Sequence, residues 1–164
     1  FSSGRDMLEL RDRLAAEGYG IAAPCFRDGP CPALAQEGQT CHSDFSWTPG
    51  PQLRALERRA GLDKSRVKST AFVFRPQDTP EAGPPEEPPR YRVVSEPMLN
   101  KAGRLRLLLC GAEGRFPLSA RIGEGNPGET TFAELGRSDA VVVENPMQRE
   151  TGWALGADTI LRRI

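Results

Sequence analysis

Apolar residues near the start of the chain recur at the spacing of an α-helix. Met7, Leu10 and Leu14 are separated by three and then four positions, so they share one face of a helix over residues 5–17. Gly18 follows at the position where glycine commonly ends a helix. The pattern therefore predicts an amphipathic helix that buries the face carrying Met7, Leu10 and Leu14.

The pattern of apolar positions then changes. Residues 19–23 form a short apolar run, which predicts a buried strand. Residues 51–59 favour a second helix, because Pro51 suits a first helical turn and Gly61 suits an exit. Residues 67–74 are rich in strand-forming side chains and predict another strand. The first half of the chain is therefore expected to mix helices and strands around an irregular segment.

A proline-rich segment divides the chain. Residues 76–90 hold six prolines in fifteen positions and no large apolar side chain. Proline lacks a backbone N–H and breaks both helices and central strands, so this composition predicts a solvated linker. The linker separates residues 1–75 from residues 91–164.

The second half of the chain has a different texture, in which short apolar runs alternate with turn-forming residues. One short helix is expected over residues 130–135, with Thr131 as a candidate cap. Several short strands joined by tight turns favour a small antiparallel β-sheet or partial barrel, and the whole chain is predicted to be α+β. The expected strands are residues 91–95, 104–110, 115–121, 140–144 and 159–164.

Charge and hydropathy exclude some classes of protein. The chain has 22 basic and 22 acidic residues, so no chain-wide field attracts it to nucleic acid or membrane. Its apolar runs are far shorter than the roughly 18 residues of a membrane span, and residues 1–14 show no secretory signal. We expect an intracellular protein with reduced thiols and no membrane partner. Because residue 1 is Phe and not Met, the sequence leaves open whether a segment precedes it in the full protein.

Four cysteines carry the main candidate chemistry. Cys25, Cys31 and Cys41 form a C-x5-C-x9-C pattern in a segment rich in proline and glycine, and Cys110 ends an apolar run much later. Four thiolates suit either a [4Fe–4S] cluster or a tetrahedral Zn²⁺, and the spacing does not choose between them. Two disulfides or four unrelated thiols are the alternatives. A metal centre is favoured, and it would tie the two halves of the chain together.

Other motifs give weaker signals. His42 is a conceivable fourth ligand of a Cys3His zinc site, but a position near the ligands or on the surface is favoured. Gly123, Gly125 and Gly128 formally match G-x-G-x-x-G, but they lack the βαβ setting of a nucleotide-binding loop. With one histidine and no paired carboxylate motif, catalysis by this part of the protein is not expected, and no catalytic or cofactor-binding residue is assigned.

Basic residues gather between positions 54 and 68. They are consistent with contact to RNA phosphates, and equally with a solvated surface balanced by Glu57 and Asp63. Phe45 and Trp47 lie just before them, where they are expected to shield the metal centre from water, with stacking on RNA bases as the alternative. The basic residues are Arg54, Arg58, Arg59, Lys64, Arg66 and Lys68.

The cysteine segments resemble those of the methyltransferase-like proteins associated with the small ribosomal subunit, which include a mitochondrial assembly factor and bacterial relatives. Members commonly carry Ala-Pro-Cys-Pro-His, Cys-Pro-Leu and Trp-Cys-His-Phe, then a late cysteine followed closely by glycine. In this chain Phe26-Arg27 replaces Pro-His and Thr40 replaces Trp. The matching segments are Ala22-Ala23-Pro24-Cys25, Asp28-Gly29-Pro30-Cys31-Pro32, Cys41-His42 and Leu109-Cys110-Gly111.

This resemblance implies a function. It implies that Cys25, Cys31, Cys41 and Cys110 bind a [4Fe–4S] cluster in the C-terminal part of a ribosome assembly factor. The small ribosomal subunit or its rRNA would be the partner, in the bacterial cytoplasm by preference or in the mitochondrial matrix. A zinc-stabilised interaction module without catalytic activity is the alternative, and an electron carrier is a third.

The resemblance also implies a domain organisation. Residues 1–75 would complete a class I methyltransferase-like sheet and contribute the cysteine-rich metal loop. Residues 76–90 would be the linker, and residues 91–164 a β-rich domain that supplies the fourth cysteine. Whether the protein is an enzyme stays open, because S-adenosylmethionine would bind only in an upstream methyltransferase domain of the same protein.

Overall fold

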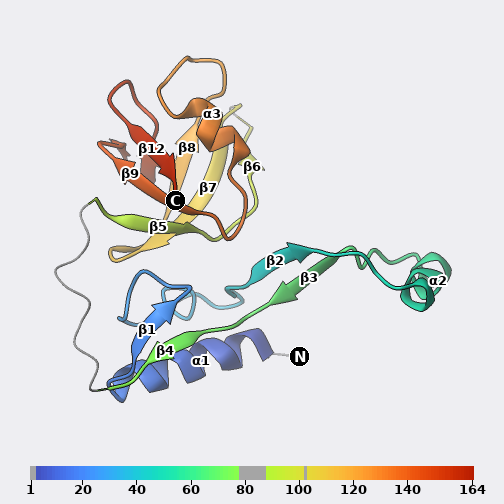
Figure 1. The fold of residues 1–164 in the computed structure, drawn as a ribbon. Coiled ribbons are helices and arrows are strands. Elements are labelled where there is room, and N and C mark those ends of the chain that lie inside the picture. The colour runs from blue at the N-terminus through green and yellow to red at the C-terminus, as the bar shows by residue number, and fades with distance from the viewer. Residues whose placement is uncertain (1–2, 78–87, 102) are drawn as a thin grey trace.

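The computed structural model describes residues 3–77, 88–101 and 103–164. Most of the predicted linker lies outside these residues. Figure 1 shows an N-terminal region, residues 3–77, beside a C-terminal region, residues 88–101 and 103–164, in which the strands curl around one another. The mixed α+β class is confirmed, together with the small antiparallel sheets and a curled sheet.

The N-terminal region begins with helix α1 (Ser3–Ala16) and strand β1 (Gly20–Ala23). Strand β1 pairs in antiparallel fashion with β4 (Val73–Arg75), and α1 runs alongside this pair (Figure 1). The buried face of α1 differs from the prediction: Leu8 and Arg11 are 0% and 1% exposed, whereas Leu10 is 37% exposed. The helix was predicted correctly, but the face it buries was not.

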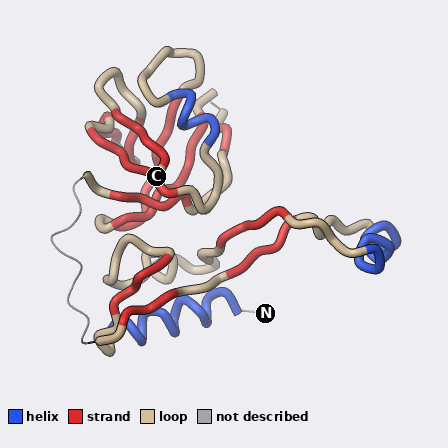
Figure 2. The backbone as a smooth tube through the Cα atoms, viewed as in Figure 1, coloured by secondary structure: helices blue, strands red, loops and turns tan. Residues whose placement is uncertain are grey.

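Between β1 and β4 the chain leaves the body of the molecule and returns. Strand β2 (Ser43–Ser46) pairs in antiparallel fashion with β3 (Arg66–Ser69), and helix α2 (Pro51–Ala60) closes the far end. We call residues 43–69 the arm. Figure 2 shows that the end of the arm with α2 projects away from the rest of the molecule. The strand predicted over residues 67–74 is therefore two strands, one in the arm and one beside β1.

The C-terminal region holds one sheet of eight strands in the order β10-β11-β8-β7-β5-β9-β12, with β6 beside β7. Only the β11–β8 pair is parallel among the described pairs. The five predicted strands all occur within two residues of their expected bounds, whereas the three shortest strands were not predicted. The strands are β5 (Arg90–Val93), β6 (Met98–Leu99), β7 (Leu105–Gly111), β8 (Gly114–Ala120), β9 (Ala140–Glu144), β10 (Met147–Arg149), β11 (Gly152–Ala154) and β12 (Ile160–Arg163).

The hydrophobic core lies inside this curled sheet. Tyr91 packs edge-to-face on both Phe116 and Trp153, with ring centroids 5.5 Å apart in each pair, a favoured geometry for aromatic rings. Around them lie aliphatic side chains from β5, β7, β8, β9 and β12 and Phe132 of helix α3 (Glu129–Glu134). The C-terminal region therefore has an apolar core of its own.

The glycine-rich loop before α3 is folded onto its own helix. Helix α3 is capped by Gly128 in the left-handed conformation, not by Thr131 as predicted. The carboxylate of Glu129 accepts the backbone N–H groups of Gly123, Gly125 and Asn126. The N–H groups that a nucleotide-binding loop would offer to phosphate therefore already have an intramolecular acceptor.

Candidate metal centre

Helix α1 orders the segment that carries three of the four cysteines, residues 24–42, which we call the cysteine loop. The buried guanidinium of Arg11 donates to the carbonyl oxygens of Arg27 at 2.8 Å and Gly29 at 2.6 Å, and to the carboxylate of Asp12 at 2.6 Å. That carboxylate in turn accepts the backbone N–H of Cys31 at 2.9 Å. Buried polar groups need such partners, so Arg11 is buried because it satisfies the loop backbone.

Further polar contacts hold the remainder of the cysteine loop. The carboxylate of Asp28 accepts the backbone N–H of Ile21 at 2.6 Å, which closes the first turn after β1. Arg5 donates to carbonyl oxygens between residues 34 and 39, and Thr70 donates its hydroxyl to the carbonyl oxygen of Cys41 at 3.0 Å. The cysteine loop is thus positioned mainly by hydrogen bonds, each satisfying one of its backbone groups.

The fourth cysteine reaches the cysteine loop because of the two-residue period of β7. Leu107 and Leu109 are fully buried in the core, so the alternate position, Cys110, lies on the outer face. Its paired neighbours on the flanking strands are Arg92 of β5 and Arg115 of β8. Paired residues share one face of a sheet, which places Cys110 between two cationic side chains.

All four cysteines line one cavity of about 30 Å³ between the two regions. Helix α1, the cysteine loop, the segment before β4 and strands β7 and β8 all contribute to its walls. The sequence prediction that these cysteines come together from both halves therefore has a structural counterpart, while their role as metal ligands stays a prediction. The lining residues are Leu8, Arg11, Cys25, Arg27, Cys31, Pro32, Ala33, Cys41, Phe72, Val94, Cys110 and Arg115.

The described side chains do not form a ready-made site for a single metal ion. Within residues 3–77, 88–101 and 103–164, no group of three or more His, Cys, Asp or Glu side chains is placed to hold one metal ion. A metal-binding function of the cysteine loop is therefore not established by the fold. The four cysteines share a cavity without forming the tight cage that a single ion requires.

The thiols influence one another electrostatically. Burial, together with the neighbouring Cys25, Cys41 and Cys31, raises the pKa of Cys110 to about 11. Burial also raises the pKa of Cys25 and of Cys41, although Arg11 and Arg115 respectively oppose these shifts. Without a metal these three thiols are protonated at pH 7, so a metal would have to displace their protons.

Three arginines on the cavity wall carry unused hydrogen-bond donors. The Nε atoms of Arg11, Arg27 and Arg115 are buried and have no hydrogen-bond partner within the described parts of the chain. A buried N–H without an acceptor is costly, whereas thiolate or sulfide sulfur beside it would accept a hydrogen bond. Four thiols with surrounding cationic donors fit a negatively charged metal–thiolate group, and the arginines were missed by the sequence analysis.

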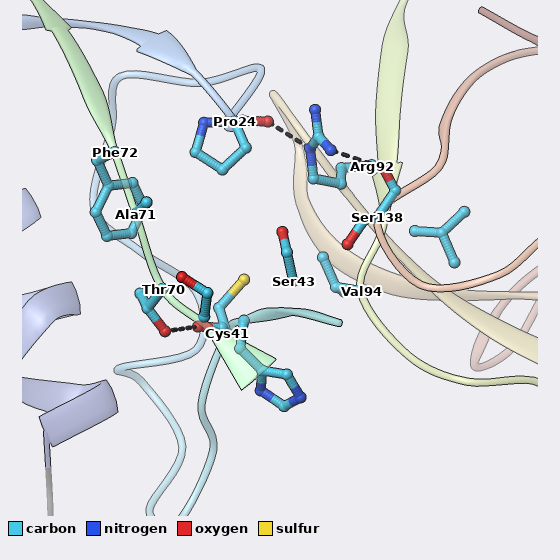
Figure 3. A pocket seen from close by; sticks show the side chains of 12 residues that line it. Pro24, Cys41, Ser43, Thr70, Ala71, Phe72, Arg92, Val94 and Ser138 are labelled. Atoms are coloured by element: carbon cyan, nitrogen blue, oxygen red, sulfur yellow. Dashed lines mark hydrogen bonds between the residues drawn. The ribbon is translucent and has the colours of Figure 1, made fainter. Parts of the chain in front are cut away.

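Direct contacts join the two regions beside this cavity. Arg92 of β5 donates from Nε to the carbonyl oxygen of Pro24 and stacks on Phe26, with 5.5 Å from its guanidinium carbon to the ring centroid. Arg115 donates to the side-chain oxygen of Gln39 at 3.2 Å. Figure 3 shows the adjoining pocket, where Arg92 bridges Pro24 and Ser138 while Cys41 approaches from the other side. The cysteine loop is thus docked on the outer face of β5, β7 and β8.

The structure corrects the expectation for Phe45 and Trp47 and agrees with the favoured position of His42 outside the ligand set. Phe45 and Trp47 lie in the arm and are 54% and 44% exposed, so they do not shield the cysteines; Phe72 lines the cavity instead. His42 lies outside the cysteine cavity, in the pocket of Figure 3. Burial lowers its pKa, and nearby Arg137 lowers it further, so the imidazole is neutral at pH 7.

The glycine after Cys110 has a steric role. A Cβ at Gly111 would collide with the ring of Tyr91 and come within 3.0 Å of the carbonyl oxygen of Arg90. Position 111 faces the core, where no additional side-chain atom fits beside the aromatic cluster. The Cys110-Gly111 pair therefore combines an outward thiol with a close approach of β7 to β5.

Comparison with known protein families gives the chain its class. The family described as mitochondrial small ribosomal subunit Rsm22 matches residues 3–121, which include all four cysteines. The chain therefore belongs to this family, a small-ribosomal-subunit-related and methyltransferase-like group. No curated protein and no solved structure matches the chain. None of the described helices is long and apolar enough to cross a membrane.

Proposed function

We propose that this chain is the iron–sulfur-binding C-terminal part of a methyltransferase-like assembly factor for the small ribosomal subunit. Cys25, Cys31 and Cys41 would bind a [4Fe–4S] cluster together with Cys110 from the other region. The observation that carries the proposal is the cavity that all four cysteines line. Family membership supplies the connection to the small subunit.

The choice of a cluster over the zinc alternative rests on the likeness of the cysteine segments to those of the family. A single Zn²⁺ needs four sulfurs at about 2.3 Å from one point, and the described residues include no group placed to hold one ion. In a [4Fe–4S] cluster each thiolate binds a different iron atom, so the four sulfurs surround a larger volume. Both an ion and a cluster need the four sulfurs gathered around one centre, so the choice of the cluster follows the family.

The proposed role of the cluster is structural. When bound, it would join three sulfurs of the cysteine loop to one sulfur of β7, and no coordination position would be left for a substrate. Arg11, Arg27 and Arg115 would offset the negative charge of the thiolates and donate to sulfur from their Nε atoms. The cysteine loop would then be fixed against the C-terminal region.

The wider setting follows the family. The family description names the mitochondrial small ribosomal subunit, so the mitochondrial matrix is the location proposed here, and a bacterial cytoplasm has no support from that description. S-adenosylmethionine would bind in an upstream methyltransferase domain of the same protein. No residue of the present chain is assigned to methyl transfer.

The cluster is tested by anaerobic purification of the full-length protein, followed by iron and acid-labile sulfide assays. We expect four iron atoms and four sulfides per chain, as the formula requires, with visible absorption. Stoichiometric zinc without iron would contradict the cluster, because Zn²⁺ has a filled d shell and is colourless. That result would instead support the zinc-stabilised interaction module.

The connection to the ribosome is tested with Cys31→Ser in the full-length protein. Loss of one thiolate should release the iron and weaken co-sedimentation with the small subunit. Ala35→Ser is the matched control, because it adds a hydroxyl at an exposed position of the same cysteine loop and should change neither. If Cys31→Ser loses its iron but binds the subunit like the wild type, the cluster has no part in ribosome association.

A further inference from the structure

The arm ends in a hollow that the metal centre does not explain. This hollow lies between the β2–β3 pair and α2, is open to solvent, and has a volume of about 480 Å³. Trp47 lines it together with Arg54 and Arg58 of α2. No side chain of α2 is buried, so the tip of the arm offers its surface to a partner.

Trp47 is held in a fixed position at the edge of this hollow. Its backbone N–H donates to the carbonyl oxygen of Ser65 at 2.9 Å, and its indole Nε1 donates to the carbonyl oxygen of Lys64. The ring is nevertheless 44% exposed. A tryptophan with its polar atom already bonded and its ring open to solvent is suited to stacking on a flat ligand.

The arm carries an excess of positive charge. It has six basic side chains, all exposed, against three acidic ones. Of these six side chains, Arg66 alone forms an ion pair within the described parts of the chain, with Asp44 at 3.2 Å and with Glu96 at 3.5 Å. The other five, which have no such pair, are Arg54, Arg58, Arg59, Lys64 and Lys68.

The acidic side chains of the hollow are occupied by the arm itself. The carboxylate of Glu57 accepts the backbone N–H of Lys64, and that of Asp63 accepts the backbone N–H of Ser65 at 2.8 Å. Both hydrogen bonds shape the turn between α2 and β3. Neither carboxylate forms an ion pair within the described parts of the chain, so the basic side chains are available to an external anion.

An exposed aromatic ring beside unpaired arginines matches the chemistry of a nucleotide. Single-stranded nucleic acids are bound by aromatic rings that stack on bases and by cations that contact phosphates. A paired base has both faces covered by its neighbours, whereas an unpaired base is free to stack on a protein side chain. The occupant that fits the hollow is thus an unpaired nucleotide within a longer polyanion.

We propose that the tip of the arm binds a single-stranded segment of RNA, with one base stacked on Trp47 and adjacent phosphates contacted by Arg54 and Arg58. Arg59, Lys64 and Lys68 extend the cationic surface to further phosphates. The choice of RNA rests on the proposed ribosomal function. The arm would then contact rRNA at a distance from the cysteine cavity, from which it projects (Figure 1).

The test measures binding of the full-length, metal-loaded protein to a labelled single-stranded RNA of about ten nucleotides by fluorescence anisotropy. Trp47→Ala should weaken binding about 5- to 100-fold, and Trp47→Phe should retain most of it. Arg54→Gln combined with Arg58→Gln should reduce the slope of log Kd against log salt by about 1.4, since each phosphate contact to a single strand contributes about 0.7.

Arg13→Gln is the matched control, because Arg13 is an exposed arginine of α1, outside the arm; it should leave binding unchanged. Duplex RNA of the same sequence should bind more weakly than the single strand. Iron content and visible absorption should be unchanged in all the arm variants, which separates a failure of the arm from a failure of the metal centre.

Two results would overturn the proposal. One is wild-type RNA affinity in both Trp47→Ala and the double arginine variant. The other is small-subunit binding that is lost in Leu56→Ser, an exposed apolar residue of α2, but kept in the arginine variant. That second result would make the arm a protein-binding surface.

Discussion

The two regions of this molecule are stabilised in different ways. The C-terminal region encloses a core cluster of twelve buried apolar residues, whereas the described N-terminal residues bury four aliphatic side chains, Leu8, Ile21, Ala33 and Pro49. Burial of apolar area is the dominant stabilising force in folding. The C-terminal region can draw on this force, whereas the N-terminal region relies on hydrogen bonds around Arg11 and on its contact with the outer face of the curled sheet.

This difference explains where the candidate metal centre lies. A loop with few apolar contacts gains most from an additional constraint, and metal binding supplies folding free energy directly. The cysteines are placed so that three come from the weakly packed cysteine loop and one, Cys110, from a strand of the well-packed sheet. The stable region would thereby hold the less stable one through the metal.

The largest effect is expected for a core substitution in the C-terminal region. Phe132→Ala removes a fully buried ring of α3 from the core cluster and should lower the free energy of unfolding by about 3–5 kcal/mol. Chemical denaturation followed by near-ultraviolet circular dichroism measures the loss. A change below about 1 kcal/mol would show that the curled sheet does not depend on this core.

A smaller effect is expected for the polar centre of the N-terminal region. Arg11→Met leaves the carbonyl oxygens of Arg27 and Gly29 without their donor and should cost about 1.5–3 kcal/mol, because hydrogen bonds to charged groups contribute about this much. Hydrogen exchange should rise across the cysteine loop and remain low in β7 and β8. Arg13→Met, at an exposed position of the same helix, should leave exchange unchanged.

The smallest effect is expected at a position that the sequence pattern places in the core. Leu10→Ala should change the free energy of unfolding by less than about 0.5 kcal/mol, because Leu10 lies on the exposed face of α1. Leu8→Ala is the matched substitution at a fully buried leucine of the same helix and should cost about 2–5 kcal/mol. Equal losses for the two variants would contradict the orientation of α1.

Sequence patterns were informative where burial is apolar and periodic. The strands of the C-terminal region alternate core and outer positions, so their bounds were predicted within two residues and Cys110 was placed at the end of β7. The face of α1 was wrong because Arg11 is buried by bonding to carbonyl oxygens of Arg27 and Gly29. Backbone acceptors sixteen and eighteen residues away leave no trace in hydropathy.

The arm was difficult to predict for a related reason. Strand β3 overlaps the strand predicted over residues 67–74, but β2 (Ser43–Ser46) has only one apolar side chain and shows no alternation that marks a half-buried strand. Helix α2 was predicted from Pro51 and Gly61 alone, and Gly61 does end it in the left-handed conformation. The arginines around the cysteine cavity were missed because Arg11 of α1, Arg27 of the cysteine loop and Arg115 of β8 approach the thiols only through tertiary packing.

The most direct test of the account compares hydrogen exchange in the metal-loaded full-length protein and in Cys31→Ser. The account predicts a specific pattern: residues 20–46 lose protection when the metal is lost, while β7, β8 and β9 exchange as slowly as in the wild type. Retained protection over residues 20–46 in the metal-free protein would contradict the claim that the four cysteines, through a bound metal, hold the N-terminal region against the C-terminal sheet.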